Sequence, residues 1–312
     1  CTIHPYFFRK TRKIQLYFCY KKLLQSGTTI FTPTAGQIDL RMLSRLQKTS
    51  NQAVFFHFHQ YTIKPKKLAR LKNIAQTHPN FVILSATEGL KKIFSQAQFP
   101  YNTHLPCPNL PSTISTLNPP QDPKDIKIIY AGAARADKGF DKVIAVLKLM
   151  EALKRDDKIE IQSSAPNTNK YDQTSQKALQ VLEECSYQHL ITHPNTLEES
   201  AYLHLFENSI SLILYDTKQY ANKYSGAAHN AFAQGSVVIS TPGTWAAEII
   251  EKYQAGIVVK DTQAKTILSA IDQIKKNYTV LQKNAFEAGC ALAAIHDPQK
   301  TWQYISAHLA KS

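Results

Sequence analysis

The second half of the chain alternates between short apolar runs and longer segments in which apolar residues recur with helical spacing. Residues 126–130 form the first run, and Phe140, Val143, Ile144 and Leu147 then follow one face of a helix. The other predicted strands are 158–162, 189–192, 210–215, 237–240 and 256–259, and the predicted helices include 197–207, 225–234 and 244–253. Strands that alternate with helices form βαβ units, so the pattern predicts an α/β fold with a parallel sheet.

The first half has the same kind of pattern but is less regular. The predicted strands there are 28–31, 53–59 and 81–85, and the predicted helices are 14–25, 39–46, 66–75 and 88–96. Three strands are fewer than the ~5–6 of an average sheet. Because the chain opens with Cys1 rather than methionine, we expect the first strand of this domain to lie upstream and the domain to be incomplete at its start.

A proline-rich polar stretch over residues 117–123 is suited to a linker between the two halves. At 312 residues the chain is long enough for two domains, each with its own hydrophobic core. We therefore predict a first domain over residues 1–120 and a second domain that begins at residue 121.

The positive charge of the chain is concentrated in the first domain. Residues 1–120 hold 16 basic and 2 acidic residues, whereas residues 121–312 hold 21 of each, so the whole net charge of +14 lies in the first domain. A one-sided positive field attracts anionic partners, such as acidic lipid headgroups, a phosphorylated acceptor or nucleic acid. A solvated basic face without a partner is the alternative. No recognised nucleic-acid-binding motif accompanies the charge, so we expect no nucleic-acid partner.

The five cysteines are widely scattered, odd in number and without a CxxC pair. This pattern predicts neither a disulfide framework nor a zinc site, and it favours a reducing, cytoplasmic environment. We find neither a secretory signal peptide nor an apolar run long enough to span a bilayer.

A cationic loop follows the strand predicted over 126–130. Arg135 and Lys138 lie there between Gly132 and Gly139, immediately before a predicted helix. Ligands of open α/β sheets bind at the carboxyl ends of strands, and a helix N-terminus attracts phosphate, which both cations are also suited to bind. The spacing matches neither GxGxxG nor GxxxxGK[ST], which disfavours a dinucleotide fold and a P-loop. Two surface cations on an ordinary strand–helix turn are the alternative.

A second candidate loop joins the strand over 210–215 to the helix over 225–234. Ser225 is suited to cap this helix, and Gly226 allows a ligand to approach the helix N-terminus. Asn230 lies one turn further along the same face as Gly226. A capped helix without a ligand is the alternative.

A third loop contains Gly243, Thr244 and Trp245 after another predicted strand. Thr244 is suited to cap the next helix while pointing into a cleft, whereas packing is the favoured interpretation for Trp245. Loops at successive strand ends of one sheet converge, so we expect the three loops to form one crevice.

In their order and spacing these motifs resemble the retaining GT-B glycosyltransferases of glycosyltransferase family 4, which are glycosyl transferases of group 1. The similarity is greatest to members with an R-x-x-K-G motif, matched by Arg135 to Gly139, and a G-T-W motif, matched by Gly243 to Trp245. Landmarks of that family's first domain resemble His57, His59, Ser85 and residues 106–109 here, and Trp302 lies in a similar C-terminal helix.

The resemblance implies two Rossmann-like domains whose parallel sheets face one another across a cleft, with residues 121–295 as the nucleotide-sugar-binding domain. The first domain would bind the acceptor, and residues 296–312 would form a helix that crosses back onto it. It further implies a retaining, metal-independent hexosyltransferase that uses a nucleotide-diphosphate-sugar, needs no cofactor and acts on a glycan, lipid-linked or other acceptor. Such enzymes make cell-surface polysaccharide or glycolipid, so the expected location is the cytoplasm, peripherally on the inner face of the membrane.

The resemblance also assigns roles to single residues. The expected catalytic residues are Arg135, Lys138 and His59, with no metal ligands. The expected donor-binding residues are Gly132, Gly139, Tyr215, Asn222, Ser225, Gly226, Asn230 and Thr244, and the expected acceptor-side residues are His57 and Ser85. For both histidines, burial within an aromatic strand is the alternative.

The chain departs from the family at two positions, because Asn222 and Asn230 stand where the family has the two glutamates of a Glu-x7-Glu segment. An asparagine amide still accepts a hydrogen bond from a hydroxyl group but carries no charge. A catalytically weak or inactive nucleotide-sugar-binding homologue is therefore the alternative function.

Overall fold

The computed structural model describes residues 5–47, 52–62, 65–108, 117, 119–120, 122–164 and 172–309. Its contacts divide the chain into two compact units. The first unit comprises Cys1–Cys107, Asn222–Tyr224 and Gln299–Ser312, and the second comprises Pro108–Ala221 and Ser225–Pro298. The C-terminal stretch from Gln299 onward thus groups with the first unit, whereas the predicted domain boundary at residues 120–121 lies beyond the observed division after Cys107.

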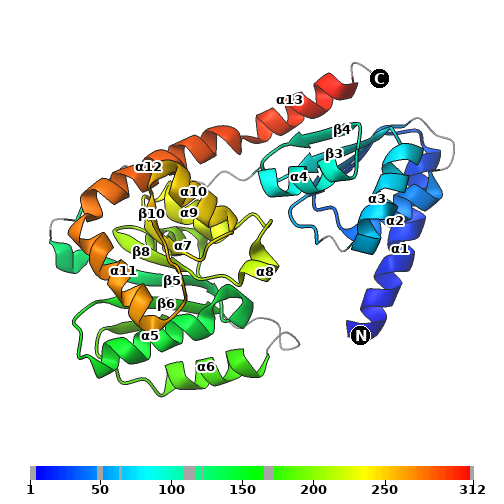
Figure 1. Cartoon of the computed structure of the whole chain (residues 1–312). Coiled ribbons are helices and arrows are strands. Elements are labelled where there is room, and N and C mark those ends of the chain that lie inside the picture. Colours follow the sequence, from blue (N-terminus) through cyan, green and yellow to red (C-terminus); the bar gives the residue numbers. More distant parts are fainter. Residues whose placement is uncertain are drawn as a thin grey trace. The chain divides into compact units, whose positions relative to one another are not determined.

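The first unit contains a parallel sheet of four strands in the order β1-β2-β3-β4 (Figure 1). These strands are β1 (Ile30–Thr32), β2 (Val54–Phe58), β3 (Phe81–Ser85) and β4 (Tyr101–His104). The helices of this unit are α1 (Pro5–Gln25), α2 (Gln37–Leu46), α3 (Pro65–Thr77), α4 (Glu88–Gln96) and most of α13 (Pro298–Leu309). Strand β4 was not predicted from the sequence because it is a short edge strand of polar, partly exposed residues without an apolar run.

The two central strands of this sheet are buried on both faces, as parallel strands usually are. Alternate side chains of β2, including Phe56 and Phe58, belong to the main core of the first unit. Phe55 points to the other face, where it packs in a smaller cluster with Leu84 and with Ile305 of α13. Helix α13 therefore completes the second face of the sheet.

The second unit contains a parallel sheet of six strands in the order β10-β9-β8-β5-β6-β7. The strands are β5 (Lys127–Ala133), β6 (Ile159–Ser164), β7 (Leu190–His193), β8 (Ser209–Ile213), β9 (Val237–Ser240) and β10 (Gly256–Val258). The helices are α5 (Phe140–Ala152), α6 (Gln173–Glu183), α7 (Glu199–His204), α8 (Thr217–Tyr220), α9 (Gly226–Ala233), α10 (Trp245–Tyr253), α11 (Ala264–Lys276) and α12 (Tyr278–Ile295). This order is that of a doubly wound Rossmann sheet, in which strands are added first on one side of β5 and then, from β8 onward, on the other side.

All six strands predicted in this unit are present, with ends shifted by a few residues, and the helices predicted after β8 and β9 are α9 and α10. The prediction succeeds because apolar residues recur with a period that the buried faces require.

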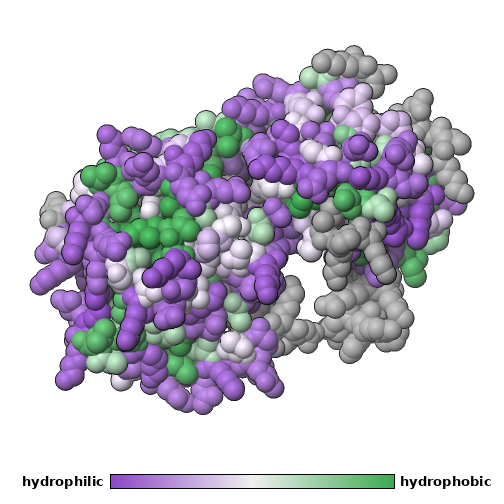
Figure 2. All heavy atoms as spheres, in the orientation of Figure 1, coloured by the Kyte–Doolittle hydropathy of each residue, from purple (hydrophilic) through white to green (hydrophobic). Residues whose placement is uncertain are grey.

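In Figure 2 hydrophobic atoms gather near β10, the edge strand whose three residues are only half-buried, while most of the visible surface is hydrophilic.

Helices α9 and α12 approach each other closely because α12 has a glycine at the crossing. A Cβ atom at Gly289 would lie 2.3 Å from the backbone oxygen of Phe232 in α9, so only glycine fits there.

Across the described part of the chain, none of the helices is both long enough and apolar enough to traverse a bilayer.

Candidate functional site

The loops after β5, β8 and β9 meet at one edge of the second sheet. These strands are neighbours and run parallel, so their carboxyl ends share an edge. The backbone N–H of Asp216 donates to the backbone oxygen of Asp137 at 3.0 Å, which ties the β8 loop to the β5 loop. The Thr241 hydroxyl donates to the Tyr215 carbonyl at 2.7 Å, which ties the β9 loop to the β8 loop. The predicted convergence of the three loops is therefore present, at the reversal point of the sheet.

The turn between β5 and α5 depends on glycine. Gly139 has a φ of 76°, and a Cβ atom there would lie 2.1 Å from the backbone oxygen of Leu214. Gly132, at the end of β5, has a φ of 153°, and a Cβ atom there would have the Lys138 Nζ as its nearest neighbour, at 3.6 Å. The turn thus packs directly against the chain leaving β8 and carries the Lys138 ammonium back over Gly132.

The charges of this turn are partly balanced by a carboxylate that the sequence prediction did not single out. Arg135 forms an ion pair with Asp137. Burial, followed by the nearby Arg135 cation, lowers the pKa of Lys138, and Asp137 counteracts this. Tyr220 of α8 also hydrogen-bonds to Asp137. The charged groups at the turn are therefore two cations and one anion, an arrangement with net positive charge that suits phosphate oxygens.

The N-terminus of α9 is capped as predicted. The Ser225 hydroxyl accepts the Ala228 N–H at 3.2 Å and donates to the Tyr215 hydroxyl at 3.3 Å. A Cβ atom at Gly226 would meet nothing within 4 Å, so there is space beside the first turn of the helix. Asn230 hydrogen-bonds to the Tyr202 hydroxyl of α7, a partner for which the sequence carries no signal.

Thr244 is buried and its hydroxyl is used within the protein. It caps α10 by accepting the Ala247 N–H at 3.2 Å, and it hydrogen-bonds to the Ser240 hydroxyl at 3.0 Å. Trp245 is buried against the ring of His296, in agreement with the packing interpretation. Thr244 therefore holds the loop after β9 in shape.

Asn222 lies within the loop after β8, but its contacts are with the other unit. It belongs to the first unit, where a Cβ atom on Gly89 of α4 would lie 2.1 Å from the Asn222 Oδ1. Glycine at position 89 thus makes room for the Asn222 amide. Asn222 and Asn230, eight residues apart in the sequence, are held by different units of the structure.

The residues predicted for the acceptor side lie at the carboxyl ends of β2 and β3. His57 and Ser85 are fully buried; His57 Nε2 lies 2.9 Å from the Leu105 carbonyl oxygen, and the Ser85 hydroxyl lies 3.4 Å from Asn102 Oδ1. His59 follows β2 and is partly exposed. Burial lowers the pKa of His59, and its hydrogen bond to the Pro33 carbonyl counteracts this. Of the three side chains, His59 is the one within reach of solvent.

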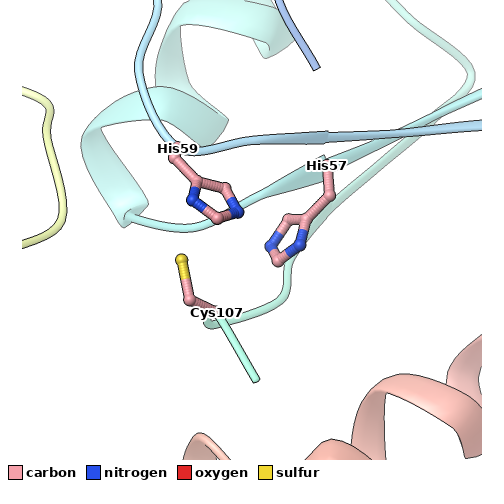
Figure 3. A group of neighbouring side chains, drawn as sticks. All are labelled: His57, His59 and Cys107. Carbon is pink, nitrogen blue, oxygen red and sulfur yellow. The ribbon is translucent and has the colours of Figure 1, made fainter. Parts of the chain in front are cut away.

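His57 and His59 also lie beside Cys107, and these three side chains could hold a metal ion (Figure 3). Their ligating atoms all lie within 4.8 Å of one another. The cysteine spacing gave no sign of such a group, because Cys107 is separated from the histidines by some 50 residues of sequence and reaches them only through the fold.

All three loops lie in a part of the chain that matches a known family. The model of the family described as "Glycosyl transferases group 1" matches residues 117–289, which are more than half of the chain. The chain belongs to this family. A search of curated proteins finds no match for the chain.

Solved structures resemble most or all of the chain. A trehalose-6-phosphate synthase structure, concerned with glycosyl transfer with retention, is 12% identical, with 100% of this chain and 80% of that chain covered and a TM-score of 0.69. Sucrose-phosphate synthase from Thermosynechococcus elongatus is 14% identical, with coverage of 88% and 72% and a TM-score of 0.67. Alr3699/HepE from Anabaena, solved in complex with UDP, is 12% identical, with coverage of 94% and 82% and a TM-score of 0.68. This glycosyl transferase of group 1 therefore has the GT-B fold, with two Rossmann-like units.

Proposed function

We propose that this group 1 glycosyltransferase is a retaining, metal-independent hexosyltransferase that moves a sugar from a nucleotide-diphosphate-sugar to a glycan, lipid-linked or other acceptor. The pathway we propose is the synthesis of cell-surface polysaccharide or glycolipid. The observation that carries the proposal is the meeting of Arg135, Lys138 and the Ser225-capped end of α9 at the reversal point of one sheet. Two of the structural neighbours support the donor class and the stereochemistry, since one contains UDP and another concerns transfer with retention.

In this mechanism the diphosphate of the donor lies over the turn between β5 and α5. Arg135 exchanges its partner Asp137 for phosphate oxygens, and Lys138 adds a second positive charge. Both cations stabilise the negative charge that develops on the diphosphate as the sugar leaves, in a polar site arranged before the reaction begins. Asn230 would accept a hydrogen bond from a ribose hydroxyl, and His59 would position the acceptor hydroxyl.

A calorimetric titration of the full chain with UDP, GDP, ADP and their sugars tests the binding step. One nucleotide class should bind, and Arg135→Gln and Lys138→Met should each weaken it by ~10-fold or more, since a charge-assisted hydrogen bond contributes about 1.5–3 kcal/mol. Lys148→Met is the matched control, because Lys148 is an exposed cation further along α5 that pairs with Glu151. Equal losses for all three variants would show only a long-range charge effect, and an absence of nucleotide binding would refute the proposal.

The alternative function is a binding protein with weak or no transferase activity, and Asn222 and Asn230 favour it. Neither side chain carries the negative charge that glutamate would supply at these positions. Hydrolysis of the donor that binds in the titration distinguishes the two functions. Hydrolysis that disappears in the Arg135→Ala, Lys138→Ala double variant supports the enzyme, whereas tight binding without turnover supports the binding protein.

We also propose that the first unit binds an anionic membrane surface. Ile14, Tyr17 and Phe18 are exposed on α1 at helical spacing, and the exposed cations Lys21 and Lys22 follow them on the same helix. Apolar side chains flanked by cations are typical of helices that lie in a membrane interface. A cytoplasmic enzyme held at the inner face of the membrane would meet a lipid-linked acceptor there.

Co-sedimentation with vesicles that contain anionic lipid tests this proposal. Phe18→Ser should reduce vesicle binding, whereas Val280→Ser, which removes an equally exposed apolar side chain from α12, should leave it unchanged. Binding that survives in Phe18→Ser and in a Lys21→Gln, Lys22→Gln variant would refute a role for α1. Binding of a soluble phosphorylated acceptor without vesicle binding would assign the basic face to the acceptor instead.

A further inference from the structure

Three side chains of the types that bind soft metal ions converge at the carboxyl end of β2. His57 is on the strand, His59 follows it by two residues, and Cys107 comes from the segment after β4 (Figure 3). The two imidazole rings are steeply inclined neighbours with centroids 4.8 Å apart and an interplanar angle of 72°. All three ligating atoms lie within 4.8 Å of one another.

Hydrogen bonds hold both histidine rings in place and set their tautomers. His57 Nε2 lies 2.9 Å from the Leu105 carbonyl oxygen, which can only accept, so Nε2 carries the proton and the lone pair is on Nδ1. His59 hydrogen-bonds to the Pro33 carbonyl. Its Nε2 is buried with no hydrogen-bond partner among the described residues, so Nδ1 makes that bond and Nε2 carries the lone pair.

This use of backbone carbonyls is the usual support of a metal-binding histidine. A histidine ligand donates its second ring N–H to a carboxylate or carbonyl group, which sets its tautomer and holds its ring. Both rings have such a carbonyl partner here. The third group, Cys107, is only 3% exposed and belongs to the first unit's core.

We propose that His57, His59 and Cys107 bind one Zn²⁺ ion through two imidazole nitrogens and one thiolate. Nitrogen and sulfur ligands select zinc among the common divalent cations, whereas Mg²⁺ and Ca²⁺ take oxygen ligands. The thiol proton passes to the solvent when the Zn–S bond forms. The fourth position of the tetrahedron is left for water, and the partly exposed His59 gives the ion a route to the site.

The geometry requires only a small closure. Zn–N bonds of ~2.0–2.1 Å and a Zn–S bond of ~2.3 Å place tetrahedral ligand atoms roughly 3.3–3.6 Å apart. The present upper separation of 4.8 Å therefore has to shrink by roughly 1.2–1.5 Å. Rotation of the Cys107 side chain, which lies outside the strand, would supply a movement of this kind while both histidine rings keep their carbonyl partners.

Zinc at this position would also affect transfer. His59 Nε2 is buried, so an acceptor hydroxyl reaches it only when the side chain moves; bound Zn²⁺ would hold this nitrogen in the cluster, and we expect zinc to inhibit the enzyme. This consequence rests on the proposed function, whereas binding of the ion does not.

Titration of the full chain with Co²⁺, a spectroscopic substitute for Zn²⁺, tests the binding. The protein used carries serine in place of Cys1, Cys19, Cys185 and Cys290, so that Cys107 is the single thiol. We expect a near-ultraviolet thiolate-to-Co²⁺ charge-transfer band that saturates at one equivalent. An equimolar amount of Zn²⁺ should abolish the band, and excess Mg²⁺ should leave it unchanged.

Two further variants separate the site from adventitious binding. Cys107→Ser should abolish the charge-transfer band, and His59→Gln, at a partly exposed position, should weaken Co²⁺ binding at least ~10-fold. Far-ultraviolet circular dichroism confirms that each variant is folded. A folded single-thiol protein without a saturable band, or a His59→Gln variant with unchanged affinity, overturns the proposal.

Discussion

Replacement of Gly139 by alanine tests the claim that the β5–α5 turn packs directly on the chain leaving β8. Two independent penalties apply at this position. The φ of 76° is unfavourable for any residue with a Cβ atom, and the new methyl group would lie 2.1 Å from the Leu214 backbone oxygen. Because that oxygen is part of the main chain, it cannot rotate out of the way.

The expected loss of stability follows from these two penalties. A left-handed backbone costs a non-glycine residue roughly 1–2 kcal/mol, and forced overpacking costs about 1–3 kcal/mol. Gly139→Ala should therefore lower the free energy of unfolding of the second unit by about 2–5 kcal/mol. This is a large share of the ~5–15 kcal/mol that stabilises a typical protein.

Urea unfolding in a Trp302→Phe background measures this loss, because Trp245, buried in the second unit, is then the single tryptophan. Gly243→Ala is the matched control, since Gly243 has a similar φ of 69° but its added Cβ would face only a Thr217 methyl group at 3.2 Å. Gly226→Ala, which meets nothing within 4 Å, should be nearly neutral.

The expected order of stability is thus Gly226→Ala above Gly243→Ala above Gly139→Ala. If Gly139→Ala costs no more than Gly243→Ala, the backbone conformation alone explains the glycine. The direct packing of the turn on Leu214 would then be wrong.

Three other perturbations test the packing and electrostatics of the second unit. Gly289→Ala should lower the midpoint of thermal unfolding, because the alanine methyl group would meet the Phe232 carbonyl. This loss should outweigh the better helix propensity of alanine, which is worth ~1 kcal/mol. A higher midpoint would contradict the close approach of the two helices. Arg155→Met should lower the free energy of unfolding in urea by about 1.5–3 kcal/mol, because buried Asp157 loses one of its two cationic partners. An unchanged urea midpoint would contradict this expectation. Burial and a neighbouring histidine lower the pKa of His229 from 6.5 to about 3, so the unfolded chain takes up a proton between these pH values that the folded chain does not. Stability should therefore fall as the pH decreases from about 6.5, and His229→Gln should flatten this dependence; identical pH profiles would contradict the assignment.

Most of the fold was predictable because it follows from periodic burial. The strands and helices of the second unit alternate in the sequence, and a parallel sheet forces the ends of β5, β8 and β9 onto one edge. That geometry is why Arg135 and Ser225 could be expected in one place. Strand β4 lacked such a signal, since its residues are polar and lie at an edge.

The details of the site required the structure, because they arise from contacts that are distant in the sequence. The ion pair that Asp137 makes with Arg135 lay within the predicted motif and could have been anticipated from their spacing of two residues. The bonds of Asn230 to Tyr202 and of His57 to the Leu105 carbonyl carry no local sequence signal. The placement of Asn222 beside Gly89 likewise depends on how the chain returns to the first unit.

The first unit is built from three separate stretches of the chain, the last of which carries Ile305. No continuous gene fragment therefore encodes it, and a shortened chain that stops at Cys107 would leave Phe55 and Leu84 without their cover from α13. Limited proteolysis after Cys107 should leave the two products associated until denaturant is added. Dissection of this protein thus calls for point variants or a covalently rejoined C-terminal helix rather than truncation.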